Sequence, residues 1–222
     1  MLALQKAEKM KKQAFADRYP YGIFSCIRTM GHIYKSRGNF DLSAQYYQEA
    51  LDYMLKNMPD QDPSQLYSSL AEYYRNTQKD YATALDYCEK ALKSAKTERN
   101  IAQAMIEKCL ILFRQGRIDE FNDCYKEAVQ MADRCKLSAN VSLLIAHISK
   151  NILDKQYEQA HAHADQLSEK GLQQHAYIYE YAKDYPNAIK YLKKYHQQLD
   201  STNNLLQLSD IAELNTQIGA ER

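Results

Sequence analysis

The sequence predicts an all-α protein in which antiparallel helix pairs stack into an elongated solenoid. The composition favours helices, because the 222 residues include only six glycines and four prolines. Hydrophobic residues make up 45% of the chain, which is enough for a continuous core. A pattern of small and aromatic residues also returns five times in order between residues 22 and 200. Copies of one helix pair bury their apolar faces against neighbouring copies, so this repetition predicts a stack.

The first expected helix covers residues 2–16, where charged and apolar residues alternate as on an amphipathic helix. This segment is typical of the second helix of an upstream repeat whose first helix is missing. We therefore expect a half repeat here, in a chain cut from a longer protein. Residues 19–22 then connect it to the first complete copy.

The first complete copy sets the pattern for the others. Gly31 allows its helix to approach a partner closely, and Tyr34 packs one turn along on the same face. Gly38 ends that helix and supplies the turn, and Phe40 starts the second helix. The inward face of the second helix recurs at i, i+4 and i+7, with Ser43, Tyr47 and Ala50.

Four further copies follow the same order of residues. The second has one extra residue in its turn and holds Ala71, Tyr74, Tyr81, Ala84, Cys88 and Ala91. The third holds Cys109, Leu112, Gly116, Ile118, Phe121, Tyr125 and Ala128. The fourth is the weakest, with Ile148, Lys155, Tyr157, Ala160, Ala164 and Leu167. The fifth holds Ala176, Tyr179, Tyr185, Ala188, Leu192 and Tyr195. Residues 1–200 are thus expected to form one repeat domain with about five helix pairs over 22–200.

The tail, residues 201–222, is expected to form a capping or connector helix. Its apolar residues stand at 205, 208, 211, 214 and 218. This spacing is also that of a coiled-coil seam, although it covers fewer than three heptads. A homodimer through the C-terminal helix is therefore one expected assembly, and a solvent-facing cap is the alternative.

The spacing of small residue, tyrosine, glycine and aromatic residue in 31–51 closely resembles the tetratricopeptide repeat. This resemblance implies a right-handed superhelical α-solenoid. Residues 20–51 are also similar to the sensor regions of tetratricopeptide-containing bacterial two-component histidine kinases, and residues 195–200 and 211–216 resemble the segment that leads into the membrane helix of that family. The resemblance implies a periplasmic sensor domain that signals through its C-terminal helix, with the kinase core downstream. The chain itself shows no signal peptide, membrane helix or kinase.

The resemblance also implies where a partner binds, because first-helix residues line the concave groove in this repeat family. We expect a protein or peptide ligand there, on a surface that is basic toward its N-terminal end and more apolar at its centre. An extended peptide with an acidic end would suit this surface. The expected groove residues are Arg28, His32, Lys35, Ser68, Glu72, Arg75, Asn76, Ile106, Phe113, Arg114, Ser149, Tyr177, Glu180 and Tyr181.

Several function classes find no support in the sequence. The net charge of +1, without a basic run, argues against nucleic-acid binding. No apolar stretch approaches the roughly 20 residues that cross a bilayer, so no membrane insertion is expected. The five cysteines are interpreted as small core residues. His161 and His163 stand two apart, so on a helix they point apart and cannot share a metal. We expect no catalytic site, metal or cofactor.

Three functions remain. The first is the sensor part of a histidine kinase, located outside the cytoplasmic membrane. The second is a cytoplasmic regulator whose repeats bind a signalling peptide. The third is a scaffold for complex assembly.

Overall fold

The computed structural model describes the backbone of residues 2–137, 140–168 and 171–220, and the side chains of residues 3–137, 140–168, 171–202 and 205. In this part the chain forms only helices. They are α1 (Leu2–Ala16), α2 (Pro20–Ser36), α3 (Phe40–Asn57), α4 (Ser64–Tyr73), α5 (Tyr81–Ser94), α6 (Glu98–Arg114), α7 (Ile118–Arg134), α8 (Val141–Leu153), α9 (Tyr157–Ala164), α10 (Gly171–Tyr181) and α11 (Tyr185–Ala220). A π-helical turn, η1 (Tyr74–Gln78), extends α4.

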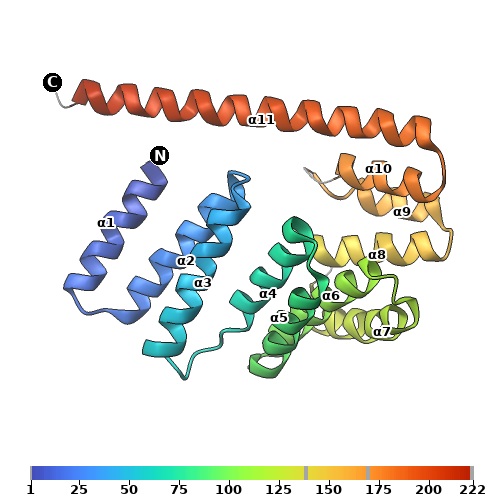
Figure 1. Cartoon of the computed structure of the whole chain (residues 1–222), viewed down its shortest axis with the longest axis horizontal. Helices are drawn as coiled ribbons and strands as arrows, with labels where there is room; N and C mark the ends of the chain where they lie inside the picture. Colours follow the sequence, from blue (N-terminus) through green and yellow to red (C-terminus); the bar gives the residue numbers. More distant parts are fainter. Residues whose placement is uncertain (1, 138–139, 169–170, 221–222) are drawn as a thin grey trace.

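The helices stack in chain order as antiparallel pairs (Figure 1). Helix α1 packs on α2, and the pairs that follow are α2 with α3, α4 with α5, α6 with α7, α8 with α9, and α10 with α11. The first helices of consecutive pairs also touch, since α4 packs on α6, α6 on α8 and α8 on α10. These first helices form an inner layer of the stack. The prediction of an all-α solenoid of helix pairs is therefore confirmed.

The turns inside the helix pairs share one backbone feature, a residue with positive φ. Gly38 and Gly116 have φ values of +74° and +72°, as expected for glycines that end a helix. Lys79, Lys155 and Lys183 adopt the same left-handed conformation in the other three turns. The copies without glycine therefore keep the turn geometry but carry the steric cost of a Cβ atom there.

The extra residue in the second turn takes the form of the π-helical turn η1, which ends at Lys79 with φ of +57°. A π-turn absorbs one additional residue without breaking the helix. It also changes the direction of the side chains that follow Tyr73. Arg75 lies inside this turn and is buried.

Close approach of the paired helices depends on small residues. A Cβ atom added to Gly31 would lie 2.7 Å from the Tyr47 ring, which confirms that glycine permits the approach of α2 to α3. Tyr34 stacks on Tyr46 with ring centroids 5.3 Å apart. The next pair repeats this contact, with 5.4 Å between the centroids of Tyr74 and Tyr87.

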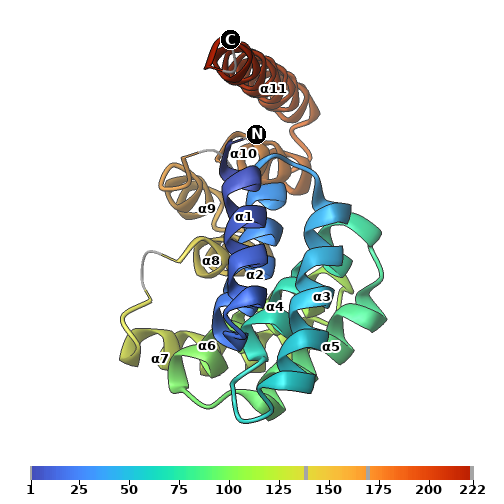
Figure 2. The same ribbon diagram turned by 90° about the vertical axis from the view of Figure 1, so that its left-hand side faces the viewer.

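Helix α11 is 36 residues long, packs against α10 and runs back past the stack toward the end that holds α1 (Figures 1 and 2). It crosses residue 200 without a break, and the division of the chain at that residue stays a prediction. The expected seam residues 208, 211, 214 and 218 lie outside the described side chains. Among the described residues, no helix combines the length and the apolar character needed to cross a membrane.

Candidate functional site

A polar cleft of about 270 Å³ lies on the inner layer, between α4, α6 and the start of α8. Six of its side chains are uncharged hydrogen-bonding groups and two are carboxylates. The residues that line it are Gln65, Ser68, Ser69, Glu72, Gln103, Glu107, Asn140 and Ser142. Of these, only Ser68 and Glu72 were expected from the sequence.

The cleft is built from equivalent positions of consecutive copies. Gln65, Gln103 and Ser142 each stand six residues before the first-helix marker of their copy, which is Ala71, Cys109 or Ile148. One turn further along α6, Glu107 occupies the position that Ser69 has on α4. The stack therefore presents one hydrogen-bonding side chain per copy along the same face. This register was readable in the sequence, once the repeats had been aligned.

Both carboxylates of the cleft are paired with cations from the predicted set. Lys35 donates to Glu72 across 2.5 Å, which joins α2 to α4. Arg75 holds Glu107 with two hydrogen bonds, Nε to Oε1 at 2.6 Å and Nη2 to Oε2 at 3.2 Å. Its Nη1 also donates to Asn76, at 2.8 Å. These pairs connect consecutive copies and leave the cleft with little net charge.

The ion pairs also raise the pKa values of the two cations. Burial lowers the pKa of Lys35, but the charge of Glu72 and its hydrogen bond outweigh this effect and leave the pKa raised. The same balance leaves the pKa of Arg75 raised beside Glu107. Both cations are therefore committed to carboxylates, which removes Lys35 and Arg75 as the basis for a basic groove. The expectation that the N-terminal end of the groove is basic stays a prediction.

Two further predicted residues lie on α2, beside Lys35. The guanidinium of Arg28 sits 5.2 Å above the centre of the Phe24 ring. The Nδ1 atom of His32 lies 2.9 Å from the Tyr47 hydroxyl. Burial, Arg28 and Lys35 all lower the pKa of His32, so this imidazole stays neutral near pH 7.

A second group of predicted residues gathers where α6 meets α10. The guanidinium of Arg114 lies 4.3 Å from the centre of the Tyr177 ring. The Phe113 ring packs against both Tyr177 and Tyr181, with centroids 6.3 and 5.9 Å away, and the two tyrosine rings also contact each other, with centroids 4.8 Å apart. Arginine and tyrosine side chains of this kind are enriched among residues that dominate protein interfaces. Glu180 is exposed on the same helix, α10.

Two predicted groove residues lie in the core instead. Ile106 is fully buried, and Ser149 is 3% exposed with its hydroxyl donating to the carbonyl of Ile145. Both occupy the same repeat positions as the cleft residues Ser68 and Glu72. The inner layer packs more tightly around α6 and α8, so neither side chain can reach a partner in this structure.

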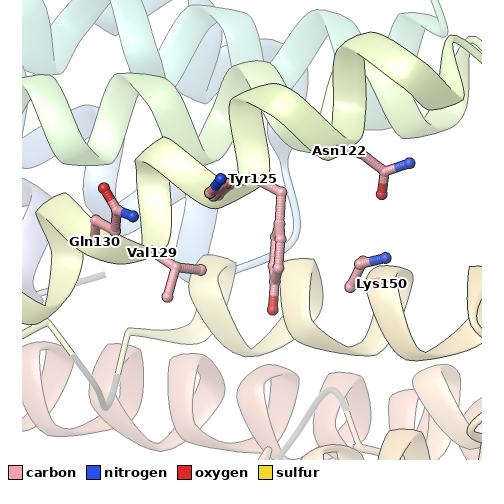
Figure 3. A pocket seen from close by; sticks show the side chains of 6 residues that line it. Asn122, Tyr125, Val129, Gln130 and Lys150 are labelled. Carbon is pink, nitrogen blue, oxygen red and sulfur yellow. The ribbon is translucent and has the colours of Figure 1, made fainter.

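A larger, more apolar cleft of about 430 Å³ opens between α7 and α8 (Figure 3). The Tyr125 ring points from α7 toward α8, and its hydroxyl lies 2.6 Å from Nδ1 of His147. Burial raises the pKa of Tyr125 to about 12. This cleft lies between the second helix of one pair and the first helix of the next, and it was not predicted from the sequence.

The histidines of α9 face different neighbours, as their spacing predicted. His161 lies 2.7 Å from His175 on α10, measured between their Nδ1 atoms, while His163 stacks on His147 of α8. Across the described residues, no three histidine, cysteine, aspartate or glutamate side chains are placed to hold a metal ion together.

Comparisons with known proteins support the repeat assignment. Residues 29–53 match the tetratricopeptide repeat family, a helical repeat that binds proteins. No curated protein matches the chain in sequence. The chain resembles the crystal structure of BtubC (BKLC) from P. vanneervenii, with 16% identity, a TM-score of 0.56, and coverage of 90% of this chain and 91% of that one.

The chain also resembles aspartyl phosphate phosphatase F from Bacillus subtilis, with 17% identity, a TM-score of 0.56 and coverage of 88% of this chain. It spans 60% of that protein's length. At such identities the likeness shows a shared helical fold only. None of these comparisons supports the resemblance to histidine-kinase sensors.

Proposed function

We propose that the chain is a binding module that holds an extended peptide segment of a partner protein in the polar cleft of α4, α6 and α8. The observation that supports this most directly is the repetition of a hydrogen-bonding side chain at one position of consecutive copies: Gln65, Gln103 and Ser142. Regularly spaced donors and acceptors match a ligand that is itself regular. An extended backbone offers an N–H and a C=O group at every residue, about 3.3 Å apart along the chain.

The charges of the cleft indicate which segment would fit. Glu72 and Glu107 each have a cation within 2.6 Å, so the cleft neither attracts nor repels a charged ligand strongly. We therefore propose a segment that is polar but nearly uncharged where it crosses α4 and α6. A second contact is proposed at Arg114 and Tyr181, both exposed, for an apolar or aromatic side chain of the same partner.

Selected peptides test this proposal. Random ten-residue peptides displayed on phage are selected against the purified chain, and the affinity of the winners is measured by calorimetry. Ser68→Arg and Gln103→Arg place long side chains in the cleft and should each weaken binding at least tenfold. Gln130→Arg, on the exposed side of α7, is the matched control and should bind as the parent does.

Circular dichroism verifies that the three variants keep the parent's helix content. Peptides that bind Ser68→Arg and Gln103→Arg as tightly as the parent would place the binding surface elsewhere. Gln130 lines the cleft between α7 and α8, so a loss of affinity caused only by Gln130→Arg would point to that cleft and reject the proposal.

A second candidate function concerns α11, which is 36 residues long. In the described part of the chain, its one extensive helix contact is with α10. We propose that this helix connects the stack to an output, as in a kinase sensor or a regulator, or joins two chains as a dimer. Sedimentation velocity on the full chain and on a chain ending at Leu199 tests the dimer. The same number of chains per particle for both would reject dimerisation through the distal helix. We further propose that this chain has no catalytic site, and that it lies outside the cytoplasmic membrane if it is a kinase sensor and in the cytoplasm otherwise.

A further inference from the structure

Two cysteines in the third helix pair lie in direct contact. Cys109 is on α6 and Cys124 is on α7, and their Sγ atoms are 2.9 Å apart. Both are free thiols in this structure. They come from opposite helices of one antiparallel pair, so a bond between them would join α6 to α7 directly.

The two thiols differ in exposure. Cys109 is fully buried, in a core cluster with Phe121 and Ala128, whereas Cys124 is only partly buried. A small oxidant in water therefore reaches Cys124 first. Cys109 stands behind it, ready to attack any oxidised sulfur.

The pKa values of the two thiols also favour Cys124 as the one that reacts first. Cys109 donates a hydrogen bond to the Cys124 sulfur, which lowers the pKa of Cys124 despite its partial burial, and Lys108 adds a positive charge nearby. The same hydrogen bond and burial raise the pKa of Cys109. The thiolate is the reactive form of cysteine, so Cys124 is the nucleophile of the pair.

We propose that Cys109 and Cys124 form a reversible disulfide when the chain meets a hydroperoxide. The Cys124 thiolate attacks one peroxide oxygen, the O–O bond breaks, and hydroxide leaves as Cys124 becomes a sulfenic acid. The Cys109 thiol then attacks that sulfur, the S–O bond breaks, and the thiol proton leaves with the departing hydroxide as water. In total, two thiols and one hydrogen peroxide give one disulfide and two waters. The sulfurs lose two electrons, which the peroxide takes up.

The disulfide would lock the helix that carries part of the polar cleft. Cys109 follows Glu107 on α6 by two residues. The bond would close a short loop, because the two cysteines are 15 residues apart. Such a cross-link restricts the unfolded chain, so the oxidised third pair should resist unfolding more than the reduced one. A dithiol such as dithiothreitol reverses the bond by thiol–disulfide exchange.

Peptide mapping after oxidation tests the proposal. The purified chain is treated with hydrogen peroxide, its remaining thiols are alkylated, and trypsin digests it without reductant. Cleavage after lysine and arginine should release residues 109–114 joined to residues 118–126, and dithiothreitol should separate them. The number of alkylated cysteines should fall from five to three. Cys124 oxidised without a cross-link, or linked to Cys88 instead, would overturn the proposal.

Thermal unfolding provides a second readout that is independent of peptide binding. Oxidation should raise the unfolding midpoint by roughly 6–12 °C in the parent chain. Cys109→Ala should abolish the shift, and alanine fits there because Ala71 fills the equivalent position on α4. Cys135→Ser is the control and should keep the full shift. An oxidation-dependent shift that persists in Cys109→Ala would also overturn the proposal.

Discussion

Changing Glu107 to glutamine tests how firmly the copies are joined across the inner layer. The substitution keeps the shape of the side chain but removes its charge. Arg75 and Glu107 are each 6% exposed at the side chain, so water cannot replace the lost partner. Arg75 would keep its contact with Asn76 and, at most, one hydrogen bond to the new amide oxygen.

The expected cost follows from that burial. Removing one member of a buried ion pair leaves an uncompensated charge and typically destabilises a protein by several kcal/mol. Because glutamine keeps one acceptor, we expect about 3 kcal/mol for Glu107→Gln, at the lower end of that range. Replacing both residues with apolar ones, as in Arg75→Met with Glu107→Leu, removes the unpaired charge. This double variant should lie within about 1 kcal/mol of the parent or above it.

Urea unfolding followed by circular dichroism measures these free energies. Asp86→Asn, which breaks the exposed pair of Asp86 with Lys90, is the matched control and should change stability by less than about 1 kcal/mol. If Glu107→Gln stayed within about 1 kcal/mol of the parent, the pair would be solvated rather than buried. If the double variant were as unstable as the single one, the cost would come from lost packing instead of charge.

Two further perturbations follow from the fold. Gly31→Ala places a methyl group 2.7 Å from the Tyr47 ring and should destabilise the chain by about 1–3 kcal/mol. The same urea curves measure this cost. An unchanged midpoint would show that α2 and α3 separate freely. Burial, followed by the nearby His175, lowers the pKa of His161 below the ordinary value of 6.5, so the unfolded chain binds the extra proton first. The stability that the neutral His161 contributes is fully present above about pH 6.5 and is lost as the pH falls below it. His161→Gln should therefore flatten the decline of the thermal midpoint between pH 7.5 and 5.5. A decline parallel to that of the parent would contradict the assignment.

The sequence was sufficient for features that lie within one copy. The small residue at Gly31 and the turn glycines Gly38 and Gly116 are short-range signals, and each has its expected place in the structure. The extra residue of the second turn was visible as well. The spacing alone did not predict that this residue would be absorbed in the π-helical turn η1, with Arg75 buried inside it.

The sequence was insufficient where residues from different copies meet. Lys35 and Glu72 are 37 residues apart, and Arg75 and Glu107 are 32 residues apart. Local spacing in the sequence therefore predicts neither pair. Their cations therefore looked free. Ile106 was expected in the groove because it shares the repeat position of Ser68, and only the depth of packing in the third copy shows that this position is closed.

Photo-cross-linking is the most direct test of the claim that the inner layer binds a peptide. A selected peptide carrying a benzophenone side chain is irradiated with the chain, and the attachment site is mapped by mass spectrometry. The proposed cleft predicts attachment within α4 or α6, at the segments that hold Ser68 and Gln103. Attachment confined to the second helices of the pairs, α5, α7 or α9, would contradict it.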